Sequence, residues 1–252
     1  MRPALHAEWT KIRTVAGPLW LLLGTVAATV ALGAGATSVA GCTPTGCGGD
    51  TTRLSLMGVY LGQAPVVILA VLVISGEYAS GMIRTSLTAV PQRVTVLAAK
   101  AVTLTGVVAV AGTVAVLGSL LAGWLILPGP GRQALSSAEG PTLRAAAGTV
   151  LYLMLIALLS LGVATAVRDS ATGIGVVLGL LYVVPIVSQI VGDPYWQRLL
   201  QKIAPMSAGL AVQATTNLRS LPVSPWAGLG VTAGWAVVAL SAGALLLRTR
   251  DA

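Results

Sequence analysis

The chain has 252 residues, of which 56% are hydrophobic and only 9% carry a charge, whereas soluble domains average about 25% charged residues. So few charges exclude a soluble globule, and the mean hydropathy of +0.89 indicates a membrane protein. The net charge of +8 is spread between apolar runs, which argues against nucleic-acid binding. Because these runs are long and do not alternate, we expect membrane-spanning helices in a lipid bilayer.

Residues 3–16 form the first predicted element, an amphipathic interfacial helix on the cytoplasmic leaflet. Leu5, Trp9 and Ile12 fall on one helical face, and the charged residues lie off it. A basic flank that only orients the first span is the alternative. Residues 17–40 follow as span 1, because this run is too long for the apolar part of a cleaved signal peptide.

The loop after span 1 contains both cysteines of the chain, Cys42 and Cys47. With the N-terminus inside, this loop faces the oxidising side of the membrane, where a disulfide persists. The intervening Thr-Pro-Thr-Gly favours a turn that brings the two cysteines together. Two free thiols or a metal pair are the alternatives, although no histidine or further cysteine lies nearby to complete a metal site.

The later apolar runs predict five further spans, each long enough for the roughly 20 residues that a helix needs to cross hydrocarbon. Residues 1–252 thus form one transmembrane domain of six spans, at about 17–40, 54–75, 98–127, 143–166, 171–191 and 224–247. Between the last two, residues 195–203 predict a short amphipathic helix on the outer leaflet. The expected fold class is an all-α polytopic membrane protein.

The distribution of Lys and Arg favours both termini in the cytoplasm, because cytoplasmic segments carry the excess of positive residues. Nine positive residues fall in segments assigned to the inside: Arg2, Lys11, Arg13, Arg84, Arg93, Lys100, Arg168, Arg248 and Arg250. Six fall in segments assigned to the outside: Arg53, Arg132, Arg144, Arg198, Lys202 and Arg219.

Motifs for catalysis are missing from the sequence. No Gly-x-x-x-x-Gly-Lys-Ser/Thr phosphate loop is present, so we expect no ATP hydrolysis by that route. The single histidine, His6, excludes a histidine-based metal cluster or a Ser–His–Asp triad. A lipid-modifying membrane enzyme would need an acid or nucleophile cluster at an interface, and none is found. We therefore expect no enzyme and no metal site.

Ionisable residues are also missing from the middles of the spans, which argues against a proton-driven transporter or an ion pump. Gln63 in span 2 and Gln189 in span 5 are the strongest polar groups at depth. They either form hydrogen bonds between helices or line a substrate path.

Residues 76–93 form a polar, glycine-punctuated segment between spans 2 and 3. On a helix that begins near Tyr78, the side chains of Tyr78, Met82 and Thr85 share one face, which suits a groove on another protein. An ordinary solvated loop whose charges set the topology is the alternative.

The pattern Gly-Glu-Tyr-x-x-Gly-x-Ile-Arg-x-x-Leu-x-x-x-Pro-x-Arg at 76–93 resembles the coupling segment of ABC-2 type transporter permeases. Glu-Trp-Thr-Lys-Ile-Arg-Thr at 8–14 looks like the interfacial helix that opens many of them. Met82 departs from the threonine expected after the second glycine. By match to the motif, the resemblance gives the coupling role to Glu77, Tyr78, Gly81, Arg84, Pro91 and Arg93.

The resemblance implies the membrane subunit of a bacterial ABC exporter in the plasma membrane, with a cytoplasmic coupling helix in 76–93. Two permease chains, as a homodimer, would pair above two copies of an ABC ATPase, which would bind the cofactors ATP and Mg²⁺. The implied cargo is an amphipathic compound, such as a peptide antibiotic, a drug or a lipid, moved outward to give resistance. A non-transporting membrane anchor or immunity factor for an ATPase is the alternative.

Overall fold

The structure is a computed structural model that describes residues 7–11, 14–40, 42–43, 46–47, 49–79, 81–82, 93–127 and 139–249. Six of its helical stretches are long and apolar enough to cross a membrane. They are α2 (Ala16–Ser38), α4 (Val59–Ala79), α6 (Arg93–Ile126), α8 (Glu139–Val167), the continuous stretch Ser170–Ile190, and α13 (Pro225–Thr249). The predicted all-α polytopic membrane fold is confirmed.

The fifth stretch is not a uniform α-helix. It consists of α9 (Ser170–Leu178), a π-helical turn η1 (Gly179–Val183) and α10 (Val184–Ile190). The π turn lies next to Pro185, whose ring removes one backbone donor and disturbs the hydrogen-bond ladder of the preceding turn.

Shorter elements connect the long helices. A two-stranded hairpin, β1 (Cys42–Thr43) with β2 (Gly46–Cys47), and α3 (Thr51–Ser55) lie between α2 and α4. Between α10 and α13 come α11 (Pro194–Ile203), α12 (Pro205–Gly209) and the 3-10 turns η2 (Leu210–Gln213) and η3 (Leu218–Ser220).

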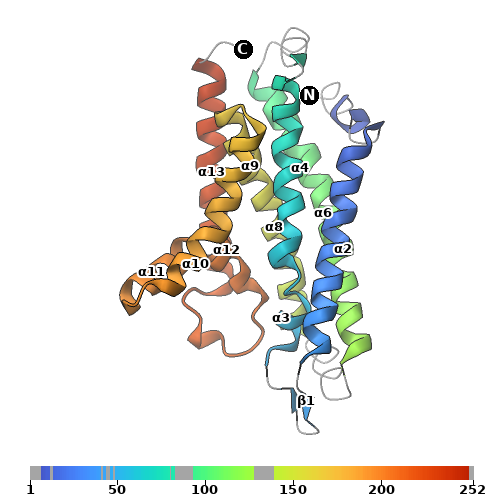
Figure 1. Cartoon of the computed structure of the whole chain (residues 1–252), viewed down its shortest axis with the longest axis vertical. Helices are drawn as coiled ribbons and strands as arrows, with labels where there is room; N and C mark the ends of the chain where they lie inside the picture. Colours follow the sequence, from blue (N-terminus) through green and yellow to red (C-terminus); the bar gives the residue numbers. More distant parts are fainter. Residues whose placement is uncertain are drawn as a thin grey trace.

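The six long helices run between two ends of the bundle (Figure 1). Residues 7–11 and the last turn of α13 lie at one end, which we name the termini end. The β1–β2 hairpin and α3 lie at the opposite end, which we name the hairpin end. An even number of crossings brings the chain back to the end where it starts.

The centre of the bundle is α8, which packs against α4, α6, α9 and α13. Its side chains Tyr152, Leu153 and Ile156 are fully buried. Large apolar side chains on the outer surfaces are exposed, for example Trp20 on α2 and Val110 on α6. An apolar outer surface of this kind suits hydrocarbon and not water.

Helix α2 packs against α4 and α6 through small residues. Its buried positions repeat every fourth residue, at Thr25, Thr29, Gly33 and Thr37. A Cβ on Gly58 would lie 1.9 Å from the carbonyl oxygen of Thr29, so the two backbones approach as closely as glycine allows. By contrast, the pairs Gly175–Gly179 and Gly230–Gly234 have the same spacing but face open space.

The second span begins and ends later than the predicted 54–75. Asp50 accepts a hydrogen bond from the backbone N–H of Arg53 and caps α3, and the chain then turns before α4 begins at Val59. At its other end α4 continues to Ala79 and includes Glu77. A charge there does not end the helix because Glu77 has partners inside the bundle, as described below.

The hairpin end is tied together by Asp50. Its carboxylate accepts hydrogen bonds from the N–H and hydroxyl of Thr215 and from the N–H of Thr216. Burial by itself would raise the pKa of Asp50, but these bonds and the one from Arg53 outweigh burial and lower the pKa below its usual value. The ionised carboxylate therefore fastens the chain before α3 to the chain before α13.

Helix α11 includes residues 195–203, where the sequence predicts a short amphipathic helix, and it has no buried residue. It projects sideways from the bundle near the hairpin end (Figure 1). The chain then turns back inward, because α12 and η2 bury Met206, Leu210 and Val212. Trp235 of α13 fixes this return by donating its ring N–H to the carbonyl of Ile203 at 2.9 Å.

The hairpin pairs Cys42 directly with Cys47. Directly opposed residues of antiparallel strands have Cα atoms about 4.5–5.5 Å apart, within the range of about 4.4–6.8 Å that a disulfide spans. The predicted disulfide therefore has a backbone that allows it, and the bond itself stays a prediction.

We expect intact cells to show no labelling of Cys42 or Cys47 by a membrane-impermeant maleimide until a reductant is added. The variant Cys42→Ser should label at Cys47 without reduction, because the substitution leaves one free thiol. Labelling can be counted by intact-protein mass spectrometry. Full labelling of the unreduced wild type would rule out the disulfide.

Candidate functional site

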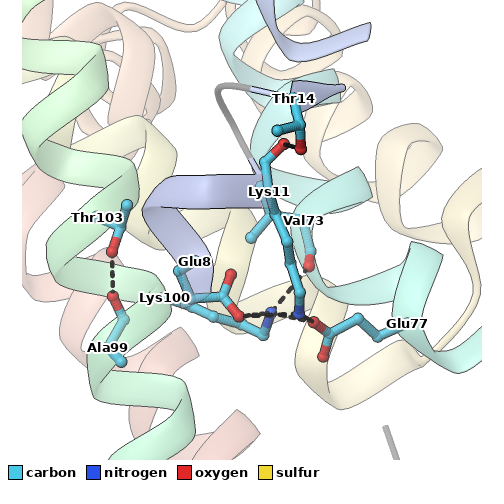
Figure 2. A network of polar contacts seen from close by, with 8 residues as sticks. All are labelled: Glu8, Lys11, Thr14, Val73, Glu77, Ala99, Lys100 and Thr103. Carbon is cyan, nitrogen blue, oxygen red and sulfur yellow. Dashed lines mark hydrogen bonds and ion pairs between the residues drawn. The ribbon is translucent and has the colours of Figure 1, made fainter. Parts of the chain in front are cut away.

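Four charged side chains form a cluster at the termini end, between residues 7–11, α4 and α6 (Figure 2). Its centre is Lys100, which stands about two turns into α6 and has a fully buried side chain. The Nζ of Lys100 lies 2.7 Å from Oε1 of Glu77 and 2.9 Å from Oε1 of Glu8. It also donates to the carbonyl of Val73 at 3.3 Å. One ammonium group thus joins three parts of the chain.

Lys11 closes the cluster on its more exposed side. Its Nζ lies 2.5 Å from Oε1 of Glu77 and 3.3 Å from Oε1 of Glu8, and its side chain is 36% exposed. Burial alone would lower the pKa of Lys11, but hydrogen bonds and attraction from Glu77 and Glu8 outweigh burial and raise the pKa above its usual value. Lys11 is therefore protonated at neutral pH.

Charge balance explains how the cluster tolerates burial. Glu8 and Glu77 are only 8% and 6% exposed, and Lys100 is 1% exposed. Removing a single ion from water costs several kcal/mol even after relaxation, unless a well-placed partner compensates it. Two ammonium groups facing two carboxylates leave no net charge, and three of their four contacts, at 2.5, 2.7 and 2.9 Å, are as short as charge-assisted hydrogen bonds. Such an arrangement holds the segments that carry these side chains in place.

The geometry of residues 7–11 explains why Glu8 and Lys11 both reach the cluster. These residues are helical, and Glu8 and Lys11 are three apart, so they lie on the same side. Trp9 is 52% exposed and lies on another side. The charged side of this predicted interfacial helix therefore faces the bundle. Leu5 and Ile12, predicted for its apolar face, lie outside the described residues.

A second contact holds the end of α4. The guanidinium carbon of Arg168 lies 5.2 Å from the centre of the Tyr78 ring, within the range of a cation–π interaction. Arg168 stands in the turn between α8 and α9 with φ of 65°, and Asp169 caps α9 by accepting from the N–H of Thr172. Tyr78 thus links α4 to the α8–α9 turn.

The predicted coupling residues are described only in part. Gly81 follows α4 with φ of +70°, the left-handed conformation that glycine supplies after a helix end. Met82 is 46% exposed, and Arg93 is the first residue of α6. Arg84, Thr85 and Pro91 lie outside the described residues. Glu77 is buried in the charge cluster, and its coupling role stays a prediction.

The two glutamines predicted for a substrate path lie in different surroundings. Gln63 is fully buried, accepts from the hydroxyl of Tyr152 and donates to the sulfur of Met206 at 3.3 Å. These contacts join α4, α8 and α12, which favours the alternative of hydrogen bonds between helices. Gln189 is exposed and lines a cavity at the hairpin end. Its place on a substrate path stays a prediction.

The sequence interpretation did not assign a site role to Glu8, Lys11 or Lys100. Lys100 carried a usable signal, because it is a single charge in an otherwise apolar run and needs a partner to be buried. The i, i+3 pair of Glu8 and Lys11 was the corresponding signal in the first helix. Nothing in the sequence, however, indicates that residues so far apart meet.

Comparisons with known proteins agree with this architecture. A family model described as "ABC-2 family transporter protein" matches residues 54–252. A comparison with curated proteins finds no match. The matched region includes five of the six spanning stretches, the end of α4 and all of α6. The chain therefore belongs to the ABC-2 transporter family and is a multi-pass membrane subunit of a transporter.

Proposed function

We propose that the chain is the permease subunit of an ATP-driven exporter in a bacterial plasma membrane, with the termini end in the cytoplasm. A separate ABC ATPase docks on the segment 76–93 and supplies the ATP and Mg²⁺ chemistry. Two copies of the chain form a homodimer above two ATPase subunits. The cargo is an amphipathic compound, such as a peptide antibiotic, a drug or a lipid.

The observation that carries this proposal is the 2.7 Å contact between Glu77 and Lys100. Glu77 lies at the start of the segment 76–93, and Lys100 lies shortly after its end, so the contact closes the base of this segment. A force on the segment then moves α4 and α6 together. Lys11 and Glu8 extend the same connection to the first helix.

A second connection carries movement deeper into the bundle. Tyr78 contacts Arg168, and Arg168 stands at the turn between α8 and α9. Movement of the end of α4 therefore reaches α8, which packs against most of the other spanning helices. Packed helices of this kind shift between discrete arrangements and do not bend gradually.

Purification of the tagged chain from its native host after gentle cross-linking tests the docking site. We expect an ATP-binding protein to co-purify with the wild type and with Arg219→Glu, which changes a charge at the hairpin end. The ATP-binding protein should not co-purify with Arg84→Glu, because this charge reversal lies in the proposed docking segment. The recovered protein can be identified by mass spectrometry. Glu77→Arg is a poor probe, since it places a third cation in the buried cluster.

Cellular accumulation separates export from an anchoring or immunity role. A host strain that lacks the chain should accumulate more of at least one labelled amphipathic antibiotic than the parent strain, and the restored chain should reverse this. Equal accumulation of every compound in both strains would remove the export function. Failure to recover any ATP-binding protein would remove the coupling assignment.

A further inference from the structure

A cavity of about 470 Å³ lies at the hairpin end, bounded by α3, α4, α10 and the α12 turn. This volume is within the range of about 300–1,000 Å³ found for small-molecule sites. The wall brings together residues from distant parts of the sequence, including Arg53, Tyr60, Gln189 and Met206. Helix α3, which carries Arg53, lies at the opposite end of the bundle from residues 7–11, which carry part of the four-charge cluster (Figure 1).

One cation lines this cavity. Arg53 is exposed, and it is the only charged side chain among the described residues of the wall. Within the part of the chain that the structure describes, no carboxylate forms an ion pair with its guanidinium. The nearest acid in sequence, Asp50, does not line the cavity and accepts hydrogen bonds from Thr215 and Thr216. The positive charge of Arg53 is therefore available to a ligand.

The other polar groups of the wall favour a ligand rich in acceptors. The hydroxyls of Ser188, Ser207 and Ser220 donate to backbone carbonyls, so their protons are already used. The side-chain amides of Gln189 and Gln201 also line the cavity and can donate to a ligand. Guanidinium and amide N–H groups together match the oxygens of a carboxylate or phosphate.

The rest of the wall is apolar. Met206, Leu210 and Leu221 line it together with Pro185 and Val223. Met206 and Leu210 are buried parts of the returning α12–η2 turn, so this surface is fixed by the packing of the bundle. A ligand that matches both the polar and the apolar part of the wall carries one anionic group and an apolar body.

We propose that this cavity binds amphipathic compounds through a carboxylate or phosphate held by Arg53, and that Arg53 determines this specificity. The apolar body of the compound lies on Met206 and Leu210. The compound is either the exported cargo or an anionic lipid that reaches the hairpin end. Its assignment as cargo rests on the proposed export function, whereas binding itself does not.

Binding of dansyl-labelled undecanoic acid to the purified chain in phosphatidylcholine nanodiscs tests the proposal through dansyl fluorescence. Arg53→Gln should weaken binding about tenfold, because it removes a charge-assisted hydrogen bond. Arg53→Lys keeps the charge and should recover most of the affinity. The methyl ester of the probe should bind weakly to the wild type and be insensitive to Arg53→Gln.

The matched control is Arg198→Gln, since Arg198 is exposed near the same end on α11 but does not line the cavity. This variant should bind the acid like the wild type. Equal weakening by Arg198→Gln, equal binding of acid and ester, or wild-type affinity in Arg53→Gln would each overturn the proposal.

Nanodiscs that contain phosphatidylglycerol distinguish the two sources of the anionic group. If this lipid displaces the probe from the wild type, the natural occupant is a lipid head group. Undiminished probe binding identifies a free anionic amphiphile as the occupant. Because the binding experiment contains no ATPase, its result is independent of whether the coupling assignment holds.

Discussion

Replacing Lys100 by methionine is expected to destabilise the protein by about 3–5 kcal/mol, because it leaves an uncompensated charge in a buried cluster. Glu8 and Glu77 would then share the single ammonium group of Lys11. Methionine has a similar length and no charge, so the loss reports electrostatics and not a cavity. This substitution should be among the most damaging single changes in the chain.

The three lysines of the chain form a matched series for this measurement. Lys11 is partly exposed in the same cluster, and Lys202 is exposed on α11. Unfolding in detergent can be followed by tryptophan fluorescence. The free energy of unfolding should fall strongly in Lys100→Met, less in Lys11→Met and hardly at all in Lys202→Met. A Lys100→Met protein as stable as Lys202→Met would show that the cluster does not form.

A second substitution separates charge balance from other effects. Glu8→Gln added to Lys100→Met leaves Lys11 opposite Glu77 with no net charge. The double variant should therefore be more stable than Lys100→Met alone, which is a favourable coupling between neighbouring sites. If it folds but no longer stimulates ATP hydrolysis by the partner, the cluster also acts in coupling and not only in stability.

The six-helix architecture could be predicted because it depends on local properties. Runs of some twenty apolar residues form helices in hydrocarbon whatever their neighbours are. The ends of the helices were less predictable. Glu77 would end a span if it were alone, but Lys11 and Lys100 neutralise it and α4 continues to Ala79. Such boundaries depend on contacts between distant segments.

The charge cluster itself could not be predicted for the same reason. Glu8 and Lys100 are separated by ninety-two positions, and only the packing of the first helix against α4 and α6 brings them together. The cavity at the hairpin end is similar, because Arg53 of α3 and Gln189 of α10 are far apart in the sequence and line the same cavity only once the bundle has packed. Sequence patterns indicated the chemical character of these residues and not their neighbours.

The spacing of glycines likewise does not indicate which residues they contact. Gly58 with Gly62 and Gly230 with Gly234 share one spacing, yet only the first pair contacts another helix, at Thr29 of α2. The spacing permits close approach and does not decide which face is buried. Whether a glycine contacts a neighbouring helix therefore has to be tested by substituting each glycine separately.

Gly228→Ala and Gly230→Ala form the second matched test, since both glycines lie near the start of α13. A Cβ on Gly228 would lie 2.0 Å from the backbone oxygen of Ala208, whereas Gly230 faces open space. Overpacking costs about 1–3 kcal/mol or more, and alanine returns at most about 1 kcal/mol of helix propensity. Gly228→Ala should therefore lose up to about 2 kcal/mol of stability, whereas Gly230→Ala should be as stable as the wild type or up to about 1 kcal/mol more stable.

The test also connects α12 to the cavity, because Ala208 is part of the cavity wall. Pushing α12 away from α13 displaces Ala208 and the neighbouring Met206, so Gly228→Ala should weaken binding of the dansyl acid even where the protein remains folded. Gly230→Ala should bind like the wild type. Thermal unfolding and probe fluorescence on the same samples measure both effects. If Gly228→Ala matches Gly230→Ala in both, α12 does not pack on α13 as the structure places it. The cavity that depends on this packing would then lose its apolar wall.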